Sequence, residues 1–251
     1  MVQEKTYNGI DVTIASDYEE LGRLAANIIL ERIYSHPKMT LLVPTGTTPL
    51  GVYRVLRHQN PKIFKKATFL NMDEYCILVD DKMMLIPETH PNSYRRYMNE
   101  NLFNRITPEA SYFPGIENVK ELGHYDNFIK NLGGIDLCLD SIGQDGHTFG
   151  FNHPGTSFDS RTRLIRINKE TREINRRLTG LETPEYAITT GLKTGVESRE
   201  IIFLVSGERK ADILYKVIYA VEPTPDIPAT ILRQHSNCIW IVDKKAASKL
   251  G

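Results

Sequence analysis

The chain has 251 residues, a length that suits one large α/β domain better than a small module. Its 31 basic side chains balance 31 acidic ones, and a net charge of zero argues against a general nucleic-acid binder or a membrane-surface protein. No stretch approaches the roughly 18 apolar residues of a membrane span, and residues 1–10 lack the apolar core of a secretory signal. Three widely spaced cysteines form neither a disulfide framework nor a zinc motif. We therefore expect a cytoplasmic protein.

Strand and helix patterns alternate along the chain. Ser16 followed by Glu19 predicts a capping box at the start of the first helix, and short apolar runs bounded by turn residues predict the strands. The predicted strands are 12–15, 39–43, 67–71, 135–142, 163–167, 200–205 and 239–242. The predicted helices are 16–34, 49–56, 93–103, 117–132, 170–178 and 208–220. This alternation predicts an α/β fold, a doubly wound, mainly parallel sheet with helices on both faces (Rossmann-like), in a single domain spanning 1–251.

Ligands of such sheets bind at the carboxyl ends of the strands, so the segments that follow strands are the places to search. The turn Thr45-Gly46-Thr47-Thr48 follows a strand and precedes a helix. Its hydroxyl groups and backbone N–H groups favour an anion, although it lacks the Lys of a nucleotide-binding P-loop. The alternative is an ordinary polar turn.

Asp73 and Glu74 stand side by side directly after the predicted strand 67–71. Neighbouring carboxylates in an apolar setting repel each other and lose solvent, which separates their proton affinities. A carboxylate with a raised pKa suits proton transfer beside a carbonyl group. The alternative is a solvated pair of acids in a loop.

The segment 143–155 places Asp145, His147 and His153 in a glycine-rich loop after another predicted strand. A His side chain moves protons in either direction near neutral pH, so His147 is a candidate acid–base group. The three side chains are also potential metal ligands, but the glycine-rich spacing matches no known ligand pattern, and we expect no metal. The alternative is a structural His in a tight turn.

Two basic groups complete the set of candidates. Arg172, Arg176 and Arg177 share one predicted helix, and Lys210 follows Gly207-Glu208-Arg209. Arg and Lys both bind phosphate, Arg as a fork and Lys as a point charge. The alternative for each is a solvated charge on a helix surface.

In this order, the motifs PTGTTP, NMDEY, HPNSY, GQDGH, FN-x-P, SRTR and GERKA resemble the glucosamine-6-phosphate deaminase/isomerase family, which shares its fold with the 6-phosphogluconolactonases. The resemblance extends over about residues 40–243. It implies conversion of an amino-sugar 6-phosphate to the ketose phosphate with loss of ammonia, without a cofactor. It further implies that Asp73 moves the proton between sugar C2 and C1, that His147 opens the sugar ring, and that Asp145 belongs to the same catalytic cluster. The implied phosphate ligands are Thr45, Gly46, Thr47, Thr48, Arg177 and Lys210.

The sequence departs from the family pattern beside His147. The deaminases read G-H-I-A-F-N-E-P, where the Glu pairs with the catalytic His, whereas this chain has one extra residue and His153 in place of that Glu. A neutral imidazole offers no negative partner, so the ring-opening relay and the choice between a gluco and a galacto sugar stay open.

Two other functions stay open as well. A lactonase would need His147 as a base but not Asp73, and a sugar-phosphate sensor would bind without turnover. In each case the expected partner is a small molecule, a hexosamine 6-phosphate for the deaminase, with no nucleic acid and no membrane, and a homo-oligomer is compatible with the sequence. We expect a polarised pocket, with Arg177 and Lys210 at one end of the sugar and Asp73 and Asp145 at the other.

Overall fold

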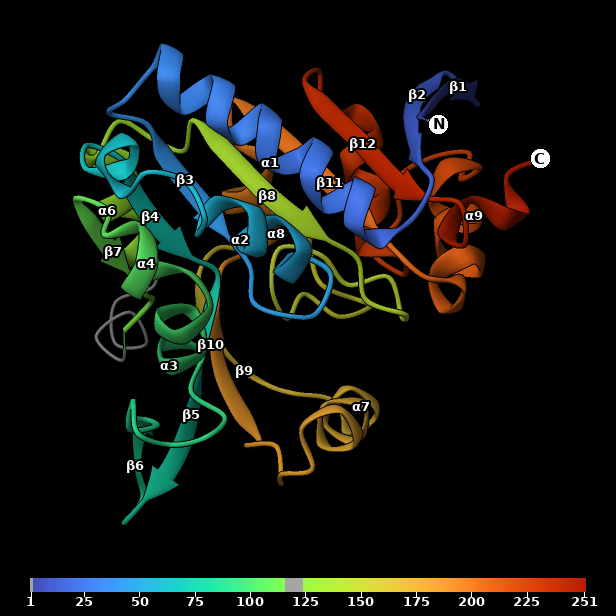
Figure 1. Ribbon diagram of the computed structural model, residues 1–251. Coiled ribbons are helices and arrows are strands. Elements are labelled where there is room, and N and C mark those ends of the chain that lie inside the picture. The colour runs from blue at the N-terminus through green and yellow to red at the C-terminus, as the bar shows by residue number, and fades with distance from the viewer. Residues whose placement is uncertain (1, 116–123) are drawn as a thin grey trace.

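The computed structural model describes residues 2–115 and 124–251. The larger of its two sheets forms the centre of the fold (Figure 1). Within those ranges it has eight strands in the order β1-β2-β12-β11-β8-β3-β4-β7, and every neighbouring pair is parallel except β1 with β2. These strands are β1 (Gln3–Tyr7), β2 (Ile10–Ala15), β3 (Thr40–Val43), β4 (Thr68–Asn71), β7 (Ala110–Tyr112), β8 (Leu137–Ser141), β11 (Glu200–Val205) and β12 (Cys238–Asp243). The predicted doubly wound α/β fold is confirmed.

Helices cover both faces of this sheet because its strands bury side chains on both. In β11, Ile201, Phe203 and Val205 join one apolar cluster, while Ile202 and Leu204 join the other. The cluster of Ile202 includes side chains of α1 and α2, and the cluster of Ile201 includes side chains of α6, α8 and α9. The helices are α1 (Tyr18–Ser35), α2 (Leu50–Leu56), α3 (Tyr94–Met98), α4 (Asn104–Ile106), α6 (His124–Asn131), α7 (Lys169–Thr179), α8 (Leu192–Val196) and α9 (Ala211–Ile218).

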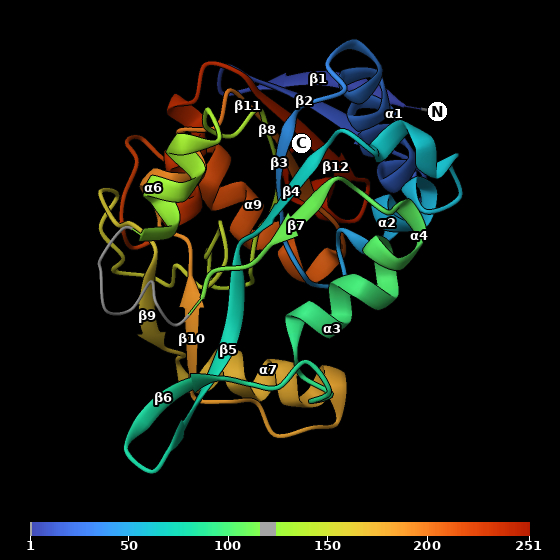
Figure 2. The same cartoon turned by 90° about the vertical axis from the view of Figure 1, so that its left-hand side faces the viewer.

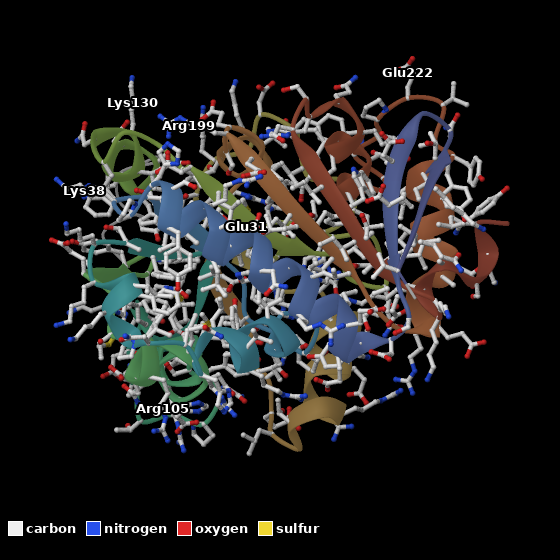
Figure 3. The ribbon with its side chains drawn as sticks, turned by 45° about the horizontal axis from the view of Figure 1, so that its top comes forward. Glu31, Lys38, Arg105, Lys130, Arg199 and Glu222 are labelled. Atoms are coloured by element: carbon white, nitrogen blue, oxygen red, sulfur yellow. The ribbon has the colours of Figure 1, made fainter. Side chains whose placement is uncertain are left out.

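Figure 3 shows α1 lying across the sheet, and the exposed side chains of Lys38 and Lys130 at the edge of the molecule. No helix in the described part of the chain is long and apolar enough to span a membrane.

A smaller antiparallel sheet projects from one end of the larger one (Figures 1 and 2). Over the described residues its order is β6-β5-β10-β9, with β5 (Asp73–Val79), β6 (Lys82–Leu85), β9 (Arg163–Arg166) and β10 (Tyr186–Thr189). Strand β5 continues the path of β4 after Met72, so one run of chain joins the two sheets. Tyr75, Phe151 and Ala187 belong to the separate apolar cluster beside it, and α7 lies next to this sheet in both views.

Several predicted boundaries need correction. The first helix is capped by Asp17 rather than Ser16: the Asp17 carboxylate accepts from the Glu20 N–H at 2.8 Å, and the Ser16 N–H donates to the Glu20 carboxylate at 2.7 Å. The predicted strand 163–167 is β9, but it belongs to the antiparallel sheet.

Two predicted helices are also modified. The helix 93–103 is divided into α3, a π-helical turn Asn99–Phe103 and α4, and 208–220 starts with a 3-10 turn Glu208–Lys210 before α9. Of the predicted helix 117–132, residues 124–131 are α6, and 117–123 lie outside the described residues.

Candidate active site

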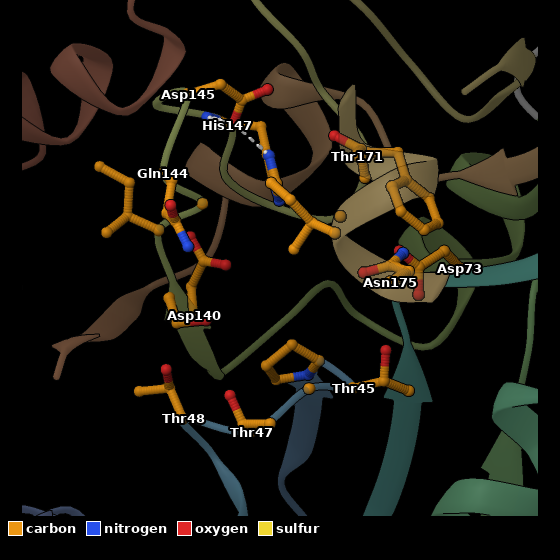
Figure 4. A pocket seen from close by; sticks show the side chains of 18 of the residues that line it. Thr45, Thr47, Thr48, Asp73, Asp140, Gln144, Asp145, His147, Thr171 and Asn175 are labelled. Atoms are coloured by element: carbon orange, nitrogen blue, oxygen red, sulfur yellow. Dashed lines mark hydrogen bonds and ion pairs between the residues drawn. The ribbon is translucent and has the colours of Figure 1, made fainter. Parts of the chain in front are cut away.

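A pocket opens at the carboxyl ends of the parallel strands, where it also meets the smaller sheet (Figure 4). Its lining comes from the turn after β3, the first residue of β5, the loop after β8, one face of α7, and Lys210. Figure 4 shows Thr45, Thr47 and Thr48 on one side of the pocket and His147 on the opposite side. The pocket therefore gathers most of the side chains that the sequence singles out, although they are far apart along the chain.

The threonine turn and Lys210 form one end of the pocket. Lys210 donates from Nζ to the Thr48 hydroxyl at 3.0 Å, and Thr45, Gly46 and Thr47 line the same pocket. Burial lowers the pKa of Lys210 to about 8, while the negative charges of Asp140 and Asp243 act in the opposite direction. A desolvated ammonium group in a pocket with hydroxyl groups is suited to an anionic ligand, which would stabilise its charge.

The side chains of Asp73 and Glu74 point in opposite directions, because these two residues begin strand β5. Successive strand residues point to opposite faces, so Asp73 lines the pocket, whereas Glu74 turns toward α3. The Glu74 carboxylate accepts from four described donors, namely the Ser93 hydroxyl and the backbone N–H groups of Tyr75, Tyr94 and Arg95, at 2.9–3.0 Å. Glu74 thus stabilises the start of α3, and Asp73 alone of this pair faces the pocket.

Asp73 is only 5% exposed, and burial raises its pKa well above the usual range, with further contributions from the charges of Glu74 and Asp140. Gly150 allows the chain to pass close to it. An ideal Cβ at position 150 would lie 3.0 Å from Asp73 Oδ2 and 2.4 Å from the Thr189 hydroxyl, and φ there is +89°. Asp73 is therefore a carboxyl group with high proton affinity, held against the wall of the pocket.

Asp140 is a pocket carboxyl that the sequence analysis missed as a site residue. It lies near the end of β8, it is 1% exposed, and its carboxylate accepts hydrogen bonds from the Thr148 hydroxyl and from the Phe149 N–H. Burial raises the pKa of Asp140 to about 6, although these hydrogen bonds lower it. The signal available in the sequence was an acid inside an otherwise apolar strand, directly before the loop of His147.

Asp145 lies between two imidazole rings. Its Oδ1 is 2.5 Å from His147 Nδ1, and its Oδ2 is 3.1 Å from His153 Nδ1. Burial would raise the pKa of Asp145, but hydrogen bonds from His147 and His153 hold it well below its usual range. The anionic partner that His153 cannot supply to His147 is therefore Asp145.

His147 packs directly on the backbone of Gly143. An ideal Cβ at Gly143 would lie 2.1 Å from His147 Cε1, so no side chain fits at position 143. Gly143 therefore leaves the space that the imidazole ring of His147 occupies, and His147 lines the pocket.

The same three side chains are the group within the described ranges that could hold a metal ion, since one ligand atom from each of Asp145, His147 and His153 lies within 4.8 Å of the others. Their facing Nδ1 and carboxylate atoms already form hydrogen bonds with one another. A His side chain held against a carboxylate in this way is suited to proton transfer.

The structure does not bring Arg177 to the pocket. Helix α7 turns Thr171, Ile174 and Asn175 toward the pocket, whereas Arg177 does not line it, is largely exposed, and pairs with Glu173 at 3.0 Å. The sequence placed three arginines on this helix, but it did not show which face meets the pocket. The basic end of the pocket is therefore formed by Lys210 without Arg177.

Instead, α7 reaches the threonine turn through a series of side-chain contacts. The Asn175 amide donates to the Tyr75 hydroxyl at 3.0 Å, the Tyr94 and Tyr75 hydroxyls are 3.0 Å apart, and Tyr94 lines the pocket together with Thr45. None of these contacts follows from the spacing of the residues in the sequence.

The fold and this pocket define an α/β protein in which carboxylates and a His share a pocket with a buried Lys and a threonine-rich turn. The model of the family "Glucosamine-6-phosphate isomerases/6-phosphogluconolactonase" matches residues 16–240, and the chain belongs to this family.

Relatives named glucosamine-6-phosphate deaminase include one from Geobacillus sp. (strain WCH70), 39% identical over 93% of each chain. Glucosamine-6-phosphate deaminase 2 of Bacillus subtilis (strain 168) is also 39% identical, over 95% of this chain and 97% of the relative. A solved structure of a monomeric glucosamine-6-phosphate deaminase matches with a TM-score of 0.82 at 34% identity, covering 94% of this chain and 98% of that one. A 6-phosphogluconolactonase from Trypanosoma cruzi, at 18% identity and a TM-score of 0.74, shares the fold.

Proposed function

We propose that this protein is a hexosamine-6-phosphate deaminase/isomerase, which converts glucosamine 6-phosphate and water into fructose 6-phosphate and ammonia, with galactosamine 6-phosphate as the alternative substrate. The observation that carries the proposal is the buried, proton-binding Asp73 in the same pocket as the Asp145–His147 pair and Lys210. The deaminase names of the relatives at 39% identity support the same reaction.

In the proposed reaction the phosphate is held by the Lys210 ammonium group and by the turn Thr45 to Thr48. Binding this remote group orients the reacting end of the sugar. His147 Nε2 takes the proton of the anomeric hydroxyl, and the same proton is delivered to the ring oxygen as the C1–O bond of the ring breaks. Asp145 stabilises the positive charge that His147 carries between these two transfers.

Asp73 then removes the proton from C2 of the open 2-ammonio aldehyde and returns it to C1, while one proton of the ammonio group passes to the C1 oxygen, which leaves a CH2OH group at C1 and a C=N bond at C2. Water hydrolyses this bond, giving the ketose phosphate and ammonia. The high proton affinity of Asp73 suits a group that must hold the C2 proton until it is transferred. Activity should therefore fall when the pH drops through the pKa of Asp73, since only the carboxylate accepts a proton.

The direct test is the release of ammonia and ketose phosphate from glucosamine 6-phosphate and, separately, from galactosamine 6-phosphate. Asp73→Asn should lower kcat by about a hundredfold or more, because the amide cannot transfer the proton. Asp80→Asn is the matched control, since Asp80 is exposed and has a positive φ that Asn tolerates.

Absence of product from both amino sugars would refute the proposal. Hydrolysis of 6-phosphogluconolactone that survives Asp73→Asn would indicate a lactonase instead. Thermal stabilisation by fructose 6-phosphate without turnover of either amino sugar would indicate a sensor.

A further inference from the structure

His153 occupies a fixed position behind the pocket rather than in its lining. Its side chain is 13% exposed, and its ring makes an edge contact with His147 at a centroid distance of 5.3 Å and an interplanar angle of 77°. Its Nδ1 faces Asp145 Oδ2 at 3.1 Å, while His147 and Asp145 line the pocket. His153 therefore meets the pocket residues from behind, through its polar contact with Asp145 and its ring contact with His147.

The residue before His153 anchors this part of the loop. The Asn152 amide donates to the backbone carbonyls of Thr148, Phe149 and Thr190 at 2.9–3.1 Å, and Asn152 is fully buried. A buried side chain with this many polar contacts allows little local movement. The backbone that carries His153 is thus held in one place beside the Asp145 carboxylate.

The tautomer of His153 follows from its two nitrogens. Nε2 is buried and finds no hydrogen-bond partner among the described residues, while Nδ1 faces a carboxylate that can only accept. A proton on Nε2 would form a buried N–H without an acceptor, and an unmade buried hydrogen bond is costly. The tautomer with its proton on Nδ1 satisfies the contact with Asp145 and avoids that penalty.

The two carboxylate oxygens of Asp145 consequently bind different imidazole rings. Oδ2 accepts from His153, and Oδ1 faces His147 Nδ1 at 2.5 Å and accepts from the His147 backbone N–H at 3.2 Å. With Oδ2 fixed, the carboxylate plane is fixed, and Oδ1 selects the His147 tautomer that carries its proton on Nδ1. The lone pair of His147 is then on Nε2, the nitrogen that the proposed ring opening uses.

We propose that His153 is a positioning residue, a neutral Nδ1–H donor that orients Asp145 and thereby keeps His147 in the tautomer needed for proton transfer. The catalytic part of this inference rests on the proposed function, whereas the tautomer can be measured without any turnover. It also explains how the chain manages with His153 where the family pattern has Glu: the charge comes from Asp145, and position 153 contributes a donor.

Two substitutions separate the donor from the bulk of the ring. In His153→Asn the amide nitrogen can replace the Nδ1–H donor, so kcat should stay within about threefold of the unaltered protein. In His153→Phe the donor is lost while a ring of similar size remains, and kcat should fall roughly tenfold to a hundredfold, as for other residues that orient a ligating or catalytic group. KM should change little in both, because His153 does not line the pocket.

His235→Phe is the matched control, since His235 is also partly buried and contacts the Ser198 carbonyl from Nε2 at 2.8 Å, away from the pocket. It should leave kcat unchanged. Thermal unfolding of each variant identifies any loss of folding, and His153→Asn keeps the inference testable if His153→Phe does not fold.

A long-range proton–nitrogen NMR spectrum of the imidazole groups gives the second readout, with the His147 signals assigned by their loss in His147→Asn. The inference expects His147 protonated on Nδ1 in the unaltered protein and in His153→Asn, and a mixture of tautomers in His153→Phe. A folded His153→Phe with full kcat and an unchanged tautomer, or a His153→Asn as impaired as His153→Phe in both readouts, would overturn it. If the unaltered protein turns over neither amino sugar, the proposed function fails, and the tautomer measurement still decides the role of His153.

Discussion

Replacing Asp140 by Asn tests the electrostatics of the pocket through protein stability. Burial raises the pKa of Asp140 from 3.8 to about 6, so the folded protein binds this proton more tightly than the unfolded chain. The resulting stabilisation is fully present below pH 3.8 and is lost as the pH rises through 6. At about 1.36 kcal/mol per pH unit, the difference between the two pKa values corresponds to about 3 kcal/mol. About 2 kcal/mol of it should be lost between pH 4.5 and pH 8.

The assay is urea unfolding of the unaltered protein and of Asp140→Asn at both pH values. The free energy of unfolding should fall by about 2 kcal/mol more for the unaltered protein than for the variant between the two conditions. Comparing the two pH values removes any constant loss from altered hydrogen bonds to Thr148 and Phe149. Equal pH dependence in both proteins would refute the reasoning, and Asp80→Asn, at an exposed site, should match the unaltered protein.

Three further substitutions test separate parts of the site. Glu74→Gln should lower the free energy of unfolding by about 2–4 kcal/mol in urea titrations, because two of the four described donors would then face an amide N–H instead of an oxygen. Gly143→Ala should lower kcat by about tenfold or more in the ammonia-release assay, because its Cβ would displace the ring of His147. Lys210→Gln should raise KM for the sugar phosphate by about tenfold or more, whereas Arg177→Gln should change it by less than about twofold.

Each of these expectations has a clear contrary result. An unchanged urea midpoint in Glu74→Gln would mean that its contacts with α3 contribute little. Full activity in Gly143→Ala would show that the His147 ring can move without loss of function. A large rise in KM for Arg177→Gln would show that Arg177 contributes to phosphate binding, contrary to its exposed position in the structure.

Strands β8 and β11 were predictable from the sequence because parallel strands covered on both faces read as nearly continuous apolar runs. Strand β5 was missed because its first two residues, Asp73 and Glu74, are acids and read as a loop. Their presence in a strand depends on contacts with Gly150 and α3 that the local sequence does not contain. The contacts that place Asp73 and Glu74 in a strand also direct Asp73 into the pocket and Glu74 toward α3.

The sequence predicted those site residues that follow strands or belong to recognisable motifs. Asp73, His147 and Lys210 follow strands, and the sheet brings such residues together at one edge. The orientation of α7 was not predictable, because the apolar spacing of a charged helix does not tell which face meets a pocket. The sequence therefore did not show that Arg177 lies outside the pocket lining. The Asp145–His153 contact depends on the path of the loop anchored by Asn152, which no spacing rule encodes.

The division of the pocket between two sheets has a consequence for how relatives can diverge. The turn after β3 and Lys210 belong to the connections of the large sheet, whereas Asp73 and the Thr171 and Asn175 side chains come from the small sheet and its helix. Under the proposed function, exchanging the α7 segment between relatives would alter the sugar that is accepted while the phosphate anchor stays intact. Under the proposed function, substrate preference would then change with α7 and the strands that support it, independently of the residues that hold the phosphate.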